Sequence, residues 1–384
     1  MPLARRLRSY FMLDAGPGRN AAMEGLRGYA VLLVVFIHAM GIICYNHRDS
    51  DPADPSPIWK ILQRHTISDT LLLTLSMGHY AVDLFFLLSA FLITRIVARQ
   101  QGRVSYAAYI RKRFLRIYPP FLVSLVFAAW VQAFVLQKIP IKMSIVLPNL
   151  VFAHGAPVIG WKIAAYNFPA WSLFYEFSFY LVFPLLFVLW KRTQGSPNAW
   201  SFMSGVLLLA AVLYTHAYLP RAATFFFGIM LGLRSDDELR RIARGLPTWL
   251  VAGFYVALSV AYATLSRNFN WFTPFYSVGI VMLFVKTCYD EGLLNRLFAN
   301  LPLRWLGNIS YSLYLMHMPA MMLLDHWLPM RSWGLHPLAD AAVFVGMGMV
   351  VSLGAGLALY AGVERWYFRK PKATSAVEPL RLAA

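Results

Sequence analysis

The fold is decided by the stretch Glu24-Gly-Leu-Arg27-Gly-Tyr-Ala-Val-Leu-Leu-Val-Val-Phe-Ile-His38. This apolar run predicts a membrane-spanning helix over residues 25–45, because about 20 apolar residues cross a bilayer. Ten residues separate Arg27 from His38. That spacing is about three helical turns and a rise of roughly 16 Å, so both side chains point to the same side. We expect Arg27 near a membrane surface and His38 well inside, where an ionisable residue is costly and usually functional.

The composition of the whole chain agrees with a membrane protein. The 384 residues are 59% hydrophobic and 14% charged, whereas soluble proteins are about 45–50% apolar and about 25% charged. The apolar residues gather in blocks, and backbone amides in lipid need internal partners, so the spans should be helical. We predict an all-α polytopic bundle of about ten transmembrane helices, near residues 25–45, 71–94, 117–137, 169–190, 201–217, 219–233, 248–266, 271–288, 307–328 and 338–363.

The net charge of +18 is explained by topology. With both termini in the cytoplasm, about 26 of the 35 basic residues fall on the cytoplasmic side, as the positive-inside rule requires. The basic excess therefore does not indicate a nucleic-acid partner. We expect a cytoplasmic segment at 1–23, a transmembrane domain at 24–368 and a cytoplasmic tail at 369–384.

The region 138–169 is broken by prolines and is predicted to be an external loop, with a re-entrant or interfacial helix. Its His154, Trp161 and Tyr166 are candidates for a substrate entrance, although aromatic residues also form interfacial belts. No Cys/His spacing typical of a metal site occurs, so we expect no metal.

Two readings of the first helix stay open at this stage. Arg27 either holds an anionic ligand at the membrane rim or extends to the interface and pairs with Glu24. His38 either meets the other end of that ligand or forms a hydrogen bond to a neighbouring helix.

The second predicted helix carries an intramembrane carboxylate, Asp83, which needs a partner. His38 is a candidate, since a carboxylate would fix the imidazole tautomer and stabilise its cation. Ser89 lies about 120° around the helix from Asp83, which favours a packing role beside Ala90.

Three further segments carry polar residues at helical spacing. Arg113 and Arg116 share a helix face and could hold a polyphosphate, or serve as topology anchors and lipid contacts. Trp171 is followed by the stripe of Ser172, Glu176 and Tyr180; Glu176 is a second intramembrane carboxylate, and its alternative role is a structural pair with an arginine. In the last segment Ser310, Tyr314 and His317 share a stripe next to Tyr311, and could orient an acceptor or join helices.

These segments, in this order, resemble integral-membrane acyltransferase family 3. The resemblance rests on Arg27 and His38; on Asp83, Phe85, Phe86 and Ser89; on Arg113, Arg116, Tyr118 and Pro119; on Trp171, Ser172, Leu173, Glu176, Phe179 and Tyr180; and on Ser310, Tyr311, Tyr314, Leu315 and His317. Ala90 stands where the family has Gly, and Trp366 follows Glu364-Arg365 where Pro is common.

The resemblance implies a multi-pass protein of the bacterial cytoplasmic membrane. It would move an acyl group, often acetyl, from cytoplasmic acyl-CoA to a hydroxyl of a sugar, polysaccharide or lipid-linked glycan. His38 would be the general base or a transient acyl carrier, oriented by Asp83 or Glu176. Arg27, Arg113 and Arg116 would bind acyl-CoA, and the acceptor would lie among Trp171, Ser172, Tyr180, Tyr311, Tyr314 and His317. The alternative is a proton-coupled transporter that uses the intramembrane Asp83, Glu176 and His38 as a relay.

Overall fold

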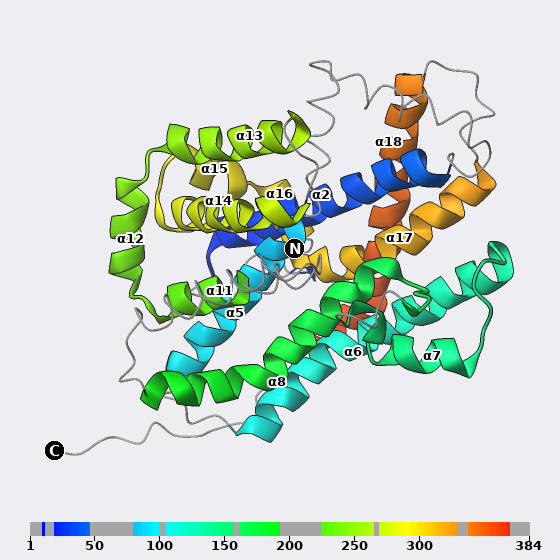
Figure 1. The fold of residues 1–384 in the computed structure, drawn as a ribbon, viewed down its shortest axis with the longest axis horizontal. Coiled ribbons are helices and arrows are strands. Elements are labelled where there is room, and N and C mark those ends of the chain that lie inside the picture. Colours follow the sequence, from blue (N-terminus) through cyan, green and yellow to red (C-terminus); the bar gives the residue numbers. More distant parts are fainter. Residues whose placement is uncertain are drawn as a thin grey trace.

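The computed structural model describes residues 10–11, 19–46, 80–99, 105–156, 162–192, 224–264, 269–328 and 337–368. Within these ranges every regular element is helical, which confirms the all-α prediction (Figure 1). The α-helices are α2 (Ala21–Asn46), α5 (Ala81–Arg99), α6 (Tyr106–Trp130), α7 (Met143–Leu150), α8 (Trp171–Arg192), α11 (Thr224–Leu233), α12 (Asp236–Gly245), α13 (Thr248–Thr264), α14 (Phe269–Tyr289), α15 (Leu293–Phe298), α16 (Leu301–Asn308), α17 (Ser310–Trp327), α18 (Pro337–Leu359) and α19 (Arg365–Phe368). Single π or 3-10 turns are η2 (Val131–Val135), η3 (Ala153–Gly155), η5 (Phe168–Ala170) and η7 (Tyr360–Glu364).

Four segments of the described chain are long and apolar enough to cross a membrane. They are Ala21–Ile43, Ala81–Arg99, Tyr106–Val135 and Ala341–Tyr367. Of the ten predicted spans, 201–217 lies outside the described residues, and the other nine coincide wholly or in part with helices. The total of about ten spans and the cytoplasmic side of the termini stay predictions.

Helix α6 extends well before the predicted span. The sequence predicts the apolar span at 117–137, with Arg113 and Arg116 on one helix face just before it. The helix begins at Tyr106, where the Ser105 side chain accepts a hydrogen bond from Ala108 N, and Pro119 and Pro120 lie inside it. The basic residues Arg113 and Arg116 therefore project from the body of α6.

Helices α5 and α11 pack closely because α11 carries two glycines one turn apart. A Cβ on Gly228 would lie 2.5 Å from the carbonyl oxygen of Leu87 and 2.7 Å from the Cβ of Ala90. A Cβ on Gly232 would meet the side chain of Thr94 at 2.7 Å. Small residues at this spacing let two backbones approach in a membrane, and the two helices lie side by side in Figure 1.

The start of α2 is held against α16 in the same way. A Cβ on Gly28 would lie 2.0 Å from the carbonyl oxygen of Leu303, and one on Gly307 would lie 1.9 Å from that of Glu24. Only hydrogen fits at these positions. The crossing of α2 over α16 is therefore specified by glycine.

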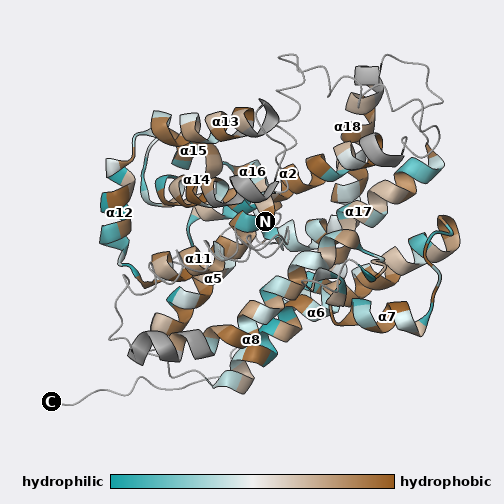
Figure 2. Cartoon of the chain, in the orientation of Figure 1, coloured by the Kyte–Doolittle hydropathy of each residue, from teal (hydrophilic) through white to brown (hydrophobic). Residues whose placement is uncertain are grey.

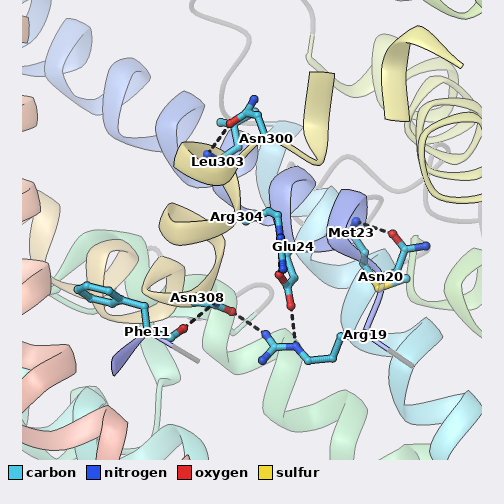
Figure 3. Close-up of polar contacts among 9 residues, drawn as sticks. All are labelled: Phe11, Arg19, Asn20, Met23, Glu24, Asn300, Leu303, Arg304 and Asn308. Carbon is cyan, nitrogen blue, oxygen red and sulfur yellow. Dashed lines mark hydrogen bonds and ion pairs between the residues drawn. The ribbon is translucent and has the colours of Figure 1, made fainter. Parts of the chain in front are cut away.

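An ion-pair cluster around the buried Glu24 carboxylate holds the same crossing (Figure 3). The Glu24 carboxylate binds Arg19 Nε at 2.6 Å and Arg304 Nε at 2.9 Å. Arg19 also donates to Asn308 Oδ1 at 2.7 Å. The described ion pairs of Glu24 are thus with Arg19 and Arg304, and the alternative pair with Arg27 is not among them.

Helix α12 is polar and lies at the end of the helix bundle that carries Arg27. It begins with a capping box between Ser235 and Glu238, and Figure 2 shows its hydrophilic surface beside the apolar α13. Lys286 of α14 donates to the Ala243 carbonyl at 3.1 Å, and Arg95 of α5 pairs with Asp236 at 2.9 Å. These bonds hold α12 across the ends of α5 and α14.

Candidate active site

A cavity of about 90 Å³ opens among α2, α5, α6, α8 and α17. Eight of the twelve predicted site residues line it: Arg27, Arg113, Arg116, Ser172, Glu176, Tyr180, Tyr311 and Tyr314. The sequence motifs therefore converge in space, although they are spread over almost 290 residues (27 to 314). Contacts between the helices arrange these side chains in layers along the cavity.

The first layer is cationic and contains Arg27, Arg113 and Arg116. Arg27 Nη2 donates to Ser310 Oγ at 3.2 Å, which fixes the start of α17 beside α2. The Arg113 guanidinium carbon lies 5.6 Å from the Tyr109 ring centre and 5.7 Å from that of Tyr180. Such a cation held over aromatic faces is positioned without being neutralised. This layer is suited to an anionic ligand.

Arg113 also has a donor to spare. Its Nε is buried and makes no hydrogen bond with any residue in the described part of the chain. A buried donor without a partner is costly. A ligand oxygen in the cavity would remove this cost.

The middle layer is a hydrogen-bonded cluster of Ser89, Glu176 and Tyr180. Ser89 Oγ donates to Glu176 Oε1 at 3.1 Å and lies 2.8 Å from the Tyr180 hydroxyl. The Tyr180 hydroxyl itself donates to Glu176 Oε1. The prediction of a packing role for Ser89 is therefore wrong, because Ser89 faces the cavity and joins α5 to α8.

The deep layer is aromatic and contains Phe85 and Tyr314, with Ser172 beside them. The Tyr314 hydroxyl donates to the Pro169 carbonyl at 2.5 Å and lies 2.8 Å from Ser172 Oγ. Tyr311 lies nearer the cationic layer, and its hydroxyl donates to the Ile117 carbonyl of α6 at 2.8 Å. Ser310 and Tyr314 of the predicted stripe therefore line the cavity.

His38 and His317 form a pair one helical turn beyond Tyr314. Nδ1 of His38 lies 3.1 Å from Nε2 of His317, and the two ring centres are 4.9 Å apart. His317 is fully buried, whereas His38 is only partly buried. Neither side chain lines the cavity. His317, predicted to meet the acceptor, is thus found as the neighbour of His38.

The hydrogen bonds of this pair define its tautomers. His317 Nδ1 lies 2.6 Å from the Tyr314 carbonyl, which can only accept, so Nδ1 carries the proton and Nε2 keeps its lone pair. His38 Nδ1 faces that lone pair and also the Val34 carbonyl at 2.8 Å, so it must be the donor. His38 Nε2 is therefore left as the unprotonated nitrogen, the form needed by a base or a nucleophile.

Two predicted site residues lie outside this arrangement. Asp83 is fully buried in the first turn of α5 and does not line the cavity. The described contacts of His38 go to Val34 and His317, so the expected pairing with Asp83 is not among them. Trp171 is buried with its ring edge-on to those of Phe86 and Tyr175. Their roles stay predictions.

The segment 138–169 also contains a buried histidine. His154 is buried, and neither ring nitrogen has a hydrogen-bond partner among the described residues. Burial lowers the pKa of His154 from 6.5 to about 4. Tyr166 is buried with its hydroxyl bound to the Pro140 carbonyl at 2.9 Å, and Trp161 lies outside the described residues.

One buried carboxylate was missed in the sequence. Glu364 lies in the π-turn η7 and accepts hydrogen bonds from the Ser312 hydroxyl at 2.5 Å and from Ser312 N at 3.2 Å. It also interacts electrostatically with Arg116 and Arg27. The signal was present, because Glu364 follows an apolar run and begins the family's closing motif, and π-turns are frequent at functional sites.

A second, larger cavity of about 700 Å³ adjoins the first. Arg27 and Leu92 line both cavities, so the two meet at the cationic layer. The second cavity is lined by several further charged side chains: Arg19, Glu24, Arg95, Arg99, Asp236, Arg240, Asp290 and Glu291. It is a polar approach to the first.

Comparisons with known proteins agree with this site. Acyltransferase MdmB of Streptomyces mycarofaciens is 35% identical over 212 residues, which cover 53% of this chain and 49% of MdmB. Peptidoglycan O-acetyltransferase OatA of Listeria monocytogenes is 25% identical over 288 residues, or 64% of this chain and 45% of OatA. BcsY of Komagataeibacter xylinus, provisionally named a membrane-bound transacylase, is 25% identical over 370 residues, or 92% of this chain and 85% of BcsY.

The extent of these matches differs. The chain spans less than half of the length of OatA. No solved structure matches the chain. A family model described as an acyltransferase domain matches residues 20–361, which is nearly the whole chain. The protein therefore belongs to acyltransferase family 3, as its motifs had indicated.

Proposed function

We propose that this protein is a membrane O-acyltransferase. It moves an acyl group, with acetyl as the first candidate, from acyl-CoA to a hydroxyl of a sugar, polysaccharide or lipid-linked glycan. Membership of the family and the names of the relatives, which include a peptidoglycan O-acetyltransferase, support the class of reaction. The donor, the acceptor and the residue roles below are part of the proposal.

The observation that carries the proposal is the layout of one cavity. Three arginines stand at one end, and the other end stops at Tyr314, one helical turn before His317 and its partner His38. An anionic carrier held at the arginines would extend its reactive end toward the only described histidine pair of the bundle.

We assign the phosphates of acyl-CoA to Arg113, Arg116 and Arg27. The unpartnered Nε of Arg113 supports this assignment, because a phosphate oxygen would satisfy it. We assign the nucleotide part of acyl-CoA to the larger cavity. The end of the site that carries the arginines is assigned to the cytoplasmic side by the positive-inside rule. Glu176, with Ser89 and Tyr180, is then a neighbour of the donor and not of His38.

His38 Nε2 is assigned as the reactive atom. As a general base it takes the proton of the acceptor hydroxyl, whose oxygen attacks the thioester carbonyl; the carbon–sulfur bond breaks, and the imidazolium returns the proton to the leaving thiolate. As a nucleophile Nε2 attacks the thioester itself and the thiolate leaves. The acceptor hydroxyl then takes the acyl group from the imidazole, and its proton passes through the imidazole to the thiolate. Both routes use the tautomer that His317 fixes.

The test measures release of the CoA thiol by isolated membranes given acetyl-CoA. Membranes that contain the wild-type protein should release thiol and acylate membrane glycan. His38→Ala at equal protein level should lower both by at least about 100-fold, within the range for a general base. Unchanged release with His38→Ala would remove His38 from the mechanism. Flux driven by a pH gradient with no thiol release by the wild type would favour the transporter.

A further inference from the structure

Two aromatic rings lie at the end of the cavity nearest the histidine pair. The ring centres of Phe85 and Tyr314 are 6.2 Å apart in an edge-to-face arrangement. The Tyr314 ring centre is in turn 5.8 Å from that of His317. Both aromatic residues line the cavity, whereas the two histidines do not. Tyr314 is thus the cavity-lining residue beside His317, and a group that moves from the cavity toward His38 meets Tyr314 and the adjacent Phe85.

The two rings are held very differently. Tyr314 is fixed by its hydroxyl, which donates to the Pro169 carbonyl and contacts Ser172. The backbone carbonyl of Tyr314 also accepts a hydrogen bond from His317 Nδ1. Phe85 has no polar atom and is partly exposed to the cavity. The Tyr314 side of the passage is therefore rigid, and the size of the residue at position 85 sets its width.

The depth of the cavity indicates which part of a donor would reach these rings. Along α8, Tyr180 contacts Arg113 and Ser172 contacts Tyr314. Eight residues of α-helix rise about 12 Å, which is the approximate distance from the cationic to the aromatic layer. With the phosphates of acyl-CoA at the arginines, the pantetheine arm fills this depth. The thioester then lies at the rings, and the acyl group must fit beyond them.

We propose that Phe85 and Tyr314 select the acyl group by size and restrict the donor to short-chain acyl-CoA. This inference rests on the proposed function, because it takes acyl-CoA as the donor. The aromatic pair acts on the passage to His38 and leaves the phosphate contacts untouched. Its signature is a change in the preference among acyl chains, not a loss of binding of CoA itself.

The experiment compares acetyl-, propionyl-, butyryl- and hexanoyl-CoA with the wild-type protein and with Phe85→Ala. Thiol release is measured in isolated membranes, and the affinity for CoA is measured by thermal stabilisation of the purified protein. We expect Phe85→Ala to raise the hexanoyl-to-acetyl ratio of kcat/KM by at least about 10-fold, since one methylene in a pocket changes selectivity by roughly 10–200-fold. Affinity for unacylated CoA should stay within about two-fold.

Two further variants keep the test decisive. Phe85→Leu reduces the side chain at position 85 by less than Phe85→Ala does. It replaces Phe85→Ala in the test if that variant does not fold. Phe134→Ala removes an equal ring from an outward-facing position that is 67% exposed, and should leave the chain-length profile unchanged. An unchanged profile in folded Phe85→Ala and Phe85→Leu, with an active wild type, overturns this inference alone. A wild type that releases no thiol from any acyl-CoA overturns the proposed function, and this inference with it.

Discussion

Nδ1 of His38 lies 3.1 Å from Nε2 of His317, and the proton between them belongs to His38 because His317 Nδ1 donates to the Tyr314 carbonyl. We therefore predict that His317 positions the base. His317→Leu removes the acceptor, so His38 can adopt the wrong tautomer, and kcat should fall by about 100-fold or more. His317→Gln keeps an acceptor near the same place and should retain activity within about 10-fold. Thiol-release kinetics check both values.

A purely structural role of His317 would give a different result. Both variants would then lose protein level or acyl-CoA affinity together, with no advantage of Gln over Leu. Equal kcat for the two folded variants would contradict the positioning role.

A second prediction concerns the hydroxyl of Ser89. Ser89→Ala removes the hydrogen bond to Glu176 and the contact with Tyr180. Loss of a bond to a charged group costs about 1.5–3 kcal/mol, so acyl-CoA turnover should fall by roughly 10- to 100-fold. The matched control is Ser352→Ala in α18, which removes a buried hydroxyl that has no hydrogen-bond partner among the described residues. Equal turnover in the two variants would show that the Ser89 hydroxyl is dispensable.

A third prediction separates the cavity arginines from other basic residues of α6. Arg113→Gln should raise the dissociation constant for acetyl-CoA by about 10-fold or more, because a charge-assisted contact to phosphate is lost. Arg111→Gln, at an exposed position of the same helix outside the cavity, should leave it within about two-fold. Titration of the purified proteins measures both constants. Equal weakening by the two changes would favour a general charge effect.

A fourth prediction tests the crossing of α2 over α16. Gly28→Ala would place a Cβ 2.0 Å from the Leu303 carbonyl oxygen, so the helices must separate. We expect a loss of about 3 kcal/mol or more of unfolding free energy, or no folded protein. Gly41→Ala lies on the same helix, where no atom of the described residues comes within 4 Å of the added Cβ, and should be neutral or stabilising. Thermal unfolding in detergent compares them, and a stable Gly28→Ala would refute the close approach.

A fifth prediction follows from the buried imidazole of His154. Its pKa is about 4 in the folded state and about 6.5 in the unfolded state. Between these values the unfolded chain binds more protons, so stability falls as the pH drops from 6.5 to 4, by up to about 3 kcal/mol. His154→Phe removes this titration and should flatten the pH dependence of the midpoint of unfolding in that window. A slope identical to that of the wild type would show that His154 does not titrate as described.

The sequence was informative about single helices. Blocks of apolar residues predicted nearly all of the described long helices, because burial in lipid requires that composition. The spacing of Arg27 and His38 predicted a common side, and both residues do contact α17, through Ser310 and His317. Arg113 and Arg116 were expected on one face and both line the cavity.

Partners across helices could not be predicted in this way. Periodicity gives the face of a helix but not the neighbour toward which that face turns. His38 was expected beside Asp83, whereas the crossing of α2 and α17 brings it to His317. Ser89 was judged by its angle from Asp83; since Asp83 does not line the cavity, the same angle turns Ser89 into it.

Tyr314 contacts both the histidine pair and the cavity, with different atoms. Its backbone carbonyl holds the proton of His317, while its ring closes the cavity and its hydroxyl is tied to Pro169. A change that moves this residue alters the base and the donor pocket at once. Relatives that evolve toward other acyl groups are therefore expected to vary at position 85 on the opposite helix, where the width of the passage can change while the tautomer of the base is preserved.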